Sequence, residues 1–225
     1  MCQLMKGNKT MTTMDVKKMG GYCMMIGPVI ALTCYFIQPG GVLGIGGTVD
    51  GYDAPGVISI LSENSGLGII TSLLIPVGLL LILGGIIIWV QSWNGTNGYA
   101  LGIIAIPMAA AAIIGWTIAS GFSIALASGI ATDTALAEGF FGLNIIGTFV
   151  FGAGATLLAI GAASRSEINT NFANFAALSG TVVAVSSAIA PFATDSGSLI
   201  QIISGLCFFI YSIWFVVLGR TITSN

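Results

Sequence analysis

The chain has 225 residues, of which 56% are hydrophobic and only 6% are charged, and it contains no histidine. A soluble domain carries about 25% charged residues, so a chain this poor in charge is expected to use lipid as its main solvent. The six basic residues are too few for a nucleic-acid-binding surface, and the missing histidines remove a common catalytic base and metal ligand.

The N-terminal region combines a polar, basic tail with the first long apolar segment. Residues 1–18 form the predicted tail, and residues 20–38 form the predicted first membrane helix. Those 19 residues, at 1.5 Å per residue, cover roughly 28 Å, which is enough to cross the hydrocarbon core. Gly27 and Pro28 are expected to loosen or kink this helix.

Residues 39–66 form the longest connection and are predicted to lie outside the membrane. The first half is too rich in glycine for a regular helix. The second half follows Pro55 and has apolar residues at amphipathic spacing from Val57 to Leu61, which predicts a short helix on the surface of the membrane or of the bundle. Asp50 and Asp53 lie among glycines, but two carboxylates without further spaced oxygen ligands do not make a calcium motif.

The next apolar stretch is too long for one helix. The second predicted span is 67–90, and the third begins at about residue 99 and ends at about 121. The polar turn between them, residues 91–98, contains Trp93 and is flanked by Trp89 and Tyr99, and these three residues predict an aromatic belt at the membrane surface. Residues 122–138 either extend the third span or lie along the surface.

The C-terminal half adds three more predicted spans, at about 140–163, 172–192 and 198–219, followed by a short tail at 221–225. The sequence therefore predicts an all-α, polytopic membrane protein whose single domain, residues 19–220, is a six-helix bundle. Threading the spans alternately through a bilayer places every basic residue on one side, and the positive-inside bias makes that side, with both termini, cytoplasmic. These basic residues are Lys6, Lys9, Lys17, Lys18, Arg165 and Arg220.

Small residues recur at four-residue spacing in three of the spans. Such stripes let helix backbones approach closely where the hydrophobic effect no longer drives association. They predict sites of tight helix packing within the bundle or between subunits. The stripe residues are Ala111, Gly115 and Ala119 in the third span, Ala155, Ala159 and Ala163 in the fourth, and Ala176, Gly180, Ala184 and Ala188 in the fifth.

Few polar side chains lie inside the spans. Asn144 and Gln201 are predicted to lie roughly 6–8 Å below the outer surface and could hydrogen-bond to each other as interhelical contacts. A role in lining a substrate path is the alternative. No Asp, Glu, Lys, Arg or His falls inside a predicted span, which argues against proton or ion coupling.

The four cysteines, at positions 2, 23, 34 and 207, form no close pair and lie outside the predicted external loops. A stabilising external disulfide is therefore not expected. Without histidine, zinc or iron–sulfur ligation is not expected either, and we predict no metal and no cofactor.

The first third of the chain resembles one family. The combination Gly27-Pro28, Gly51-Tyr52-Asp53-Ala54-Pro55 and Gly78-Leu79-Leu80-Leu81 resembles the start of an uncharacterised prokaryotic six-helix membrane family that is catalogued only as a domain of unknown function. This resemblance implies six helices and a prokaryotic cytoplasmic membrane, and it implies no activity.

Two functions fit these features. The first is a non-catalytic membrane subunit or scaffold, with membrane lipids and other subunits or further copies of itself as partners, and no nucleic acid. The alternative is a channel or facilitator for a small neutral solute or lipid, which the in-span prolines Pro28, Pro76 and Pro107 and the in-span polar residues favour. An enzyme is not expected, because no nucleophile lies beside a base.

Overall fold

A computed structural model describes residues 15–49, 52–165, 168–193 and 196–224. Every regular element in these ranges is a helix, which confirms the predicted all-helical fold, and six of the helices are long and apolar enough to cross a membrane, as the sequence predicted. The six are α1 (Val16–Ile37), α3 (Ser65–Gln91), α4 (Tyr99–Ala127), α5 (Thr134–Ala163), α6 (Thr170–Ile189) and α7 (Gly197–Ser224). A short helix α2 (Ala54–Glu63) and a 3-10 turn η1 (Ala190–Phe192) complete the described elements.

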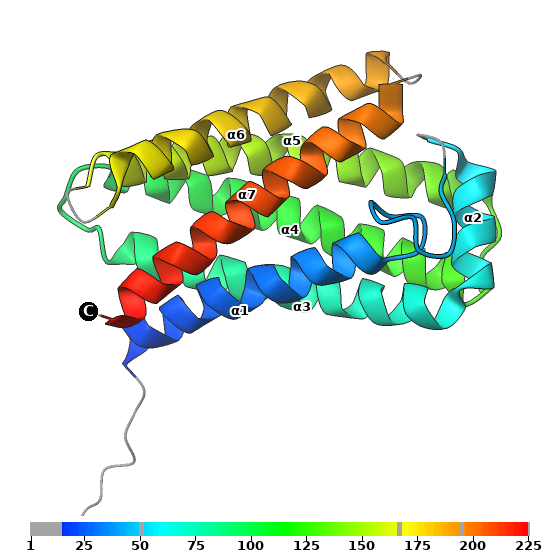
Figure 1. Cartoon of the computed structure of the whole chain (residues 1–225), viewed down its shortest axis with the longest axis horizontal. Coiled ribbons are helices and arrows are strands. Elements are labelled where there is room, and N and C mark those ends of the chain that lie inside the picture. The colour runs from blue at the N-terminus through cyan, green and yellow to red at the C-terminus, as the bar shows by residue number, and fades with distance from the viewer. Residues whose placement is uncertain (1–14, 50–51, 166–167, 194–195, 225) are drawn as a thin grey trace, which may run out of the picture.

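The six long helices form a closed ring. Each of α1, α3, α4, α5, α6 and α7 packs against the next, and α7 returns to pack against α1. The helix α2 lies across one end of this ring, where it contacts α3, α4 and α5 (Figure 1). We call this end the α2 end. A ring of six helices encloses an interior that side chains must fill or leave open.

The opposite end carries the described basic residues and is called the basic end here. The first residue of α1 and the last residues of α7 lie together there (Figure 1). The described basic residues are Lys17, Lys18, Arg165 and Arg220, and the described acidic residues near the α2 end are Asp53, Glu63, Asp133 and Glu138. The charges of the two ends therefore have opposite signs.

The segment 122–138 belongs to two helices. The helix α4 continues past the expected end at residue 121 to Ala127, and Gly129, with φ of +71°, follows its end. The helix α5 begins at Thr134, because the Asp133 side chain accepts a hydrogen bond of 2.9 Å from the backbone N–H of Ala135 and caps the first turn. Only a short connection remains between the two helices.

Glycine allows two pairs of helices to approach backbone to backbone. A Cβ atom added at Gly27 of α1 would lie 2.6 Å from the carbonyl oxygen of Gly78 of α3. A Cβ added at Gly152 of α5 would lie 2.8 Å from the carbonyl oxygen of Gly180 of α6. No side chain fits at these crossings, so glycine sets the separation of both helix pairs.

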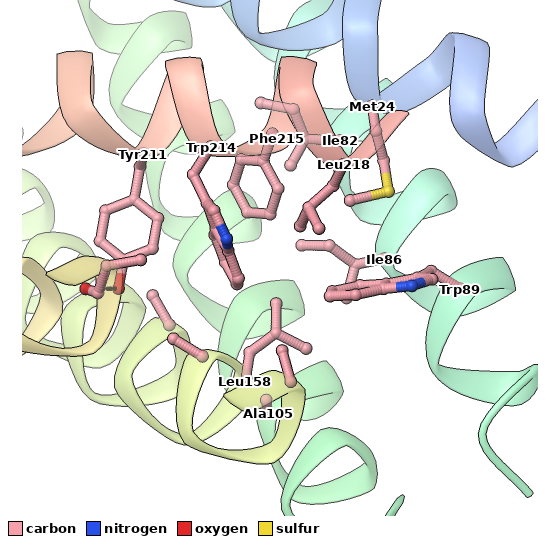
Figure 2. Packing of buried hydrophobic residues seen from close by; sticks show 14 of the residues in the cluster. Met24, Ile82, Ile86, Trp89, Ala105, Leu158, Tyr211, Trp214, Phe215 and Leu218 are labelled. Carbon is pink, nitrogen blue, oxygen red and sulfur yellow. Dashed lines mark hydrogen bonds between the residues drawn. The ribbon is translucent and has the colours of Figure 1, made fainter. Parts of the chain in front are cut away.

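The half of the ring nearer the basic end is filled by large apolar side chains. Trp214 and Leu218 of α7 and Ile86 of α3 point into a shared interior (Figure 2). Leu158 of α5 approaches from the opposite side and is 2% exposed (Figure 2). This half of the bundle is therefore a packed core with side chains in mutual contact.

Two tryptophans that the sequence placed in an aromatic belt belong to that core. Trp89 and Trp93 are 6% and 0% exposed, and their rings meet edge to face at 4.5 Å. A Cβ at Gly102 of α4 would lie 2.9 Å from the ring of Trp93, so glycine makes the space for it. The prediction of interfacial tryptophans here was wrong, because the sequence alone does not show that glycines on neighbouring helices leave room for indoles.

Candidate functional site

A cavity of about 250 Å³ occupies the half of the ring nearer the α2 end. All six long helices line it, together with α2 and the preceding loop. The lining extends along α1 from Pro28, along α3 to Ile82, along α4 from Trp116, along α5 to Phe151 and along α7 to Phe215. The cavity therefore runs from the α2 end to about the middle of the bundle. Its volume is close to the lower end of small-molecule pockets, which measure about 300–1,000 Å³.

The loop before α2, and α2 itself, lie over the mouth of the cavity. Val57 and Leu61 of α2 contribute apolar side chains to the lining, and Leu61 is 6% exposed. Tyr52 contacts the ring of Phe141 edge to face, with 5.5 Å between centroids. Burial raises the pKa of the Tyr52 phenol above its ordinary value of 10.0, so this group stays neutral at physiological pH. The described lining residues of the mouth carry no charge.

Aromatic rings close the deep end of the cavity. Phe208 meets Trp116 at 5.7 Å and Phe151 at 5.9 Å between ring centroids. Phe151 also meets Tyr211 at 6.0 Å, and the Tyr211 hydroxyl donates a hydrogen bond of 2.6 Å to the carbonyl oxygen of Ala176 on α6. We call Trp116, Phe151, Phe208 and Tyr211 the aromatic floor. Phe151 and Tyr211 also belong to the packed core, which continues from the floor toward the basic end (Figure 2), so the described cavity ends near mid-bundle.

The polar groups of the cavity are uncharged. Among the described residues that line it there is no Asp, Glu, Lys, Arg or His. Both polar residues singled out in the sequence, Asn144 and Gln201, lie in the lining. The Asn144 amide donates a hydrogen bond of 2.8 Å to the carbonyl oxygen of Phe140 in its own helix, and Gln201 interacts with the Tyr35 hydroxyl. Both side chains therefore have protein partners of their own at the cavity wall.

Serine is the most frequent polar residue type in the remaining lining, and sequence reasoning did not group these serines together. The lining serines of α4 and α7 recur on one helical face together with floor residues. Trp116, Ser120 and Ser123 follow one another at spacings of four and three on α4, and Ser204 and Phe208 are four residues apart on α7. Serines that recur on the same helical face as an aromatic residue were the sequence signal that could have identified this polar lining.

The residues of the small-residue stripes occupy different environments. In the third-span stripe Ala111 is exposed, Gly115 is half-buried and Ala119 lines the cavity. Those of the fourth and fifth spans pack mainly near the middle and the basic end of the ring. Ala155, Ala159, Ala176 and Gly180 are buried, Ala163 and Ala184 are half-buried, and Ala188 is exposed.

Two further features lie away from the cavity. At the basic end, the Arg165 guanidinium lies 5.3 Å from the centre of the Trp93 ring and donates a hydrogen bond to the Thr96 hydroxyl. Near the α2 end, Asp53 is the N-cap residue of α2, and its side chain makes no capping hydrogen bond. Asp50, the other carboxylate singled out in the sequence, lies outside the described residues. No cluster of three or more His, Cys, Asp or Glu side chains that could hold a metal occurs in the described ranges.

Comparison of the chain with protein-family models, with curated proteins and with solved structures finds no match in any of the three. The resemblance to an uncharacterised prokaryotic membrane family stays a prediction. Function must therefore be argued from the cavity and the chemistry of its walls.

Proposed function

We propose that this protein binds a small uncharged molecule within the membrane, in the cavity at the α2 end of the helix ring. The cavity itself is the observation that carries the proposal. A protein that serves only as a packed six-helix scaffold does not need an internal cavity. An empty cavity lowers the stability of the fold, because the side chains that line it lose dispersion contacts. Binding of this kind is the first step of a facilitator for a neutral solute or lipid.

The walls favour a neutral occupant. A charged ligand transferred into this half of the bundle would lose its hydration and meet no counter-charge among the described lining residues. The aromatic floor and the packed core below it favour a binding site with one mouth over an open pore. Passage of a solute to the basic end would require those side chains to move.

A pair of variants on one helix tests the proposal. Ala119 of α4 lines the cavity and is 2% exposed, whereas Ala111 of the same helix is exposed on the outside of the ring. Ala119→Phe should fill cavity space, and Ala111→Phe should add the same side chain to the lipid-facing surface. The probe is radiolabelled naphthalene, measured by equilibrium dialysis against protein in nanodiscs, with empty nanodiscs as background.

The unmodified protein and Ala111→Phe should bind naphthalene above the background, and Ala119→Phe should not. Thermal unfolding of both variants shows whether the fold is kept. Binding at the level of empty nanodiscs by the unmodified protein would refute the proposal, and so would equal binding by a folded Ala119→Phe variant.

For the membrane itself, we propose a prokaryotic cytoplasmic membrane with the basic end facing the cytoplasm. The grouping of Lys17, Lys18, Arg165 and Arg220 at one end of the ring supports this orientation through the positive-inside bias. The cavity would then open toward the external side, and a ligand would enter from there or from the outer leaflet.

A non-catalytic subunit or scaffold is the second candidate. Gly121 of α4 and Gly142 of α5 are exposed, and a Cβ atom at either would meet nothing within 4 Å. Such outward-facing glycines on neighbouring helices would let a helix of another subunit approach closely. Native mass spectrometry after gentle extraction tests this, since a strictly monomeric species without partners would argue against it.

A further inference from the structure

Five serines of the cavity wall form a group that we call the serine cluster. Each is at most 8% exposed, and each lines the cavity. They come from four different helices, so the ring brings them together although they are far apart in the sequence. The cluster consists of Ser72 on α3, Ser120 and Ser123 on α4, Ser187 on α6 and Ser204 on α7.

The hydroxyls of the serine cluster lack partners within the described protein. A buried serine or threonine in a helix usually donates to a carbonyl oxygen three or four residues earlier. Thr71 does so, with a bond of 2.8 Å to the carbonyl oxygen of Leu67, and Ser186 donates to Val183 at 3.0 Å. The described residues supply no such bond to any of the five cluster hydroxyls. Among the described side chains, Trp93 Nε1 is the one fully buried polar atom without a hydrogen-bond partner. The five serine oxygens are therefore not fully buried and remain accessible from the cavity.

Three cluster members lie at the same distance along their helices from the helix ends nearer the α2 end. Ser72 is seven residues from the start of α3, Ser120 seven from the end of α4, and Ser204 seven from the start of α7. At 1.5 Å per residue, each lies about 10 Å along its helix from that end. Ser123 and Ser187 lie closer to the mouth. The cluster therefore surrounds the upper part of the cavity, above the aromatic floor.

Hydroxyls that face the cavity must find their hydrogen-bond partners in water or in a bound molecule, and a ligand that displaces the water must replace those bonds. A ligand that satisfies them must present oxygen or another hydrogen-bonding atom at the depth of the cluster. The same ligand must present an apolar surface to the floor, where the edges and faces of aromatic rings suit a flat ring. These two requirements together describe an amphiphile with one uncharged polar end.

We propose that the ligand is an uncharged amphiphile whose carbonyl or hydroxyl oxygens bind the serine cluster while a flat apolar ring rests on the aromatic floor. This proposal deepens the proposed function and rests on it. It predicts an orientation, in which the apolar part enters first and the polar part remains nearer the α2 end.

The test compares two bicyclic probes of similar shape. Menadione, a naphthoquinone, carries two carbonyl oxygens, and naphthalene carries none. Binding of both is measured by equilibrium dialysis with protein in nanodiscs, for the unmodified chain and for a variant with all five cluster serines changed to alanine. Because these hydroxyls have no protein partner, their removal should leave the fold intact or stabilise it.

Ser179→Ala is the matched control. Ser179 is a serine 5% exposed that does not line the cavity, and its hydroxyl donates to the carbonyl oxygen of Cys207 at 3.5 Å. Losing this hydroxyl should change the binding of neither probe. Each probe is corrected for its own partition into empty nanodiscs.

Menadione should bind the unmodified protein at least about tenfold more tightly than naphthalene, since two or three hydrogen bonds to the cluster add to the same apolar contact. In the five-serine variant the two probes should bind alike, with naphthalene unchanged. Equal affinities in the unmodified protein, or menadione binding that survives loss of all five hydroxyls, would overturn the role of the cluster while leaving the cavity site intact. Naphthalene binding at the level of empty nanodiscs by the unmodified protein would instead overturn the proposed function.

Discussion

The crossing of α1 and α3 gives the sharpest test of how this bundle is held together. A Cβ atom added at Gly78 of α3 would lie 2.7 Å from both the backbone nitrogen of Ala31 and the carbonyl oxygen of Gly27. Two of the nearest atoms are backbone, so no side chain can rotate away. Gly84, on the same helix, has nothing within 4 Å of the same added atom. The substitutions Gly78→Ala and Gly84→Ala therefore differ only in what the new methyl group meets.

The two substitutions should change stability with opposite signs. Ordinary contact begins at 3.4 Å, so Gly78→Ala must separate α1 from α3 by about 0.7 Å near the crossing. A gap of that size forfeits a quarter to a half of each dispersion contact, and overpacking of this kind costs about 1–3 kcal/mol. Alanine is also a better helix former than glycine by up to about 1 kcal/mol. Both variants gain this term, which therefore cancels between them, so the two variants should differ by the overpacking cost of about 1–3 kcal/mol.

Unfolding in mixed micelles, with increasing SDS and tryptophan fluorescence as the signal, measures the difference. The midpoint should fall for Gly78→Ala and stay or rise for Gly84→Ala. Adding Ala31→Gly to Gly78→Ala removes one close carbon atom, 2.9 Å away, but leaves the two backbone contacts, so it should restore only part of the loss. Equal midpoints for the two single variants would show that backbone contact at this crossing does not determine the packing of α1 on α3.

Four further outcomes are expected. Gly180→Leu should weaken packing of α6 on α5, because its side chain would start 2.8 Å from a backbone carbonyl of α5, whereas Ala188→Leu, at an exposed position of the same helix, should change the SDS midpoint little. Tyr211→Phe should lower stability by about 0.6–1.7 kcal/mol in the same titration, through loss of its interhelical hydrogen bond. Binding of uncharged probes should stay flat between about pH 6 and 8, since the described cavity lining holds no Asp, Glu, Lys, Arg or His, and a steep change would contradict that assignment. Cysteines introduced at Thr48 and Asn94, both exposed and at opposite ends of the ring, should be labelled from opposite sides of the membrane, and labelling from one side would refute the six-span topology.

The sequence predicted the helices well, because each membrane-crossing helix must satisfy its own backbone hydrogen bonds within a long apolar segment. The boundaries between α4 and α5 were harder to predict. The segment 122–138 is moderately apolar throughout, and the cap at Asp133 that divides it is a local hydrogen bond that hydropathy does not report.

The cavity could not be predicted from hydropathy at all. The hydropathy of a serine such as Ser204 does not show whether the side chain faces a neighbouring helix, lipid or an enclosed cavity. The order of helices around the ring decides among these, and that order depends on crossings such as the one between Gly27 and Gly78. The polar residues Asn144 and Gln201 were singled out because amides are rare in such spans, whereas serines such as Ser72 and Ser187 are scattered through the spans and could not be grouped from the sequence.

The closure of the ring by α1 and α7 has a consequence for biogenesis. Their backbones meet at Gly21 and Gly219, where a Cβ at Gly21 would lie 2.8 Å from the carbonyl oxygen of Gly219. A ribosome delivers α1 first and α7 last of these helices, so α1 must wait in the bilayer with one flank covered only by lipid. The cavity does not exist during that interval, because one of its walls has not been made. A ligand present in the membrane could therefore act on the last step of assembly and favour the docking of α7, as well as on the finished protein.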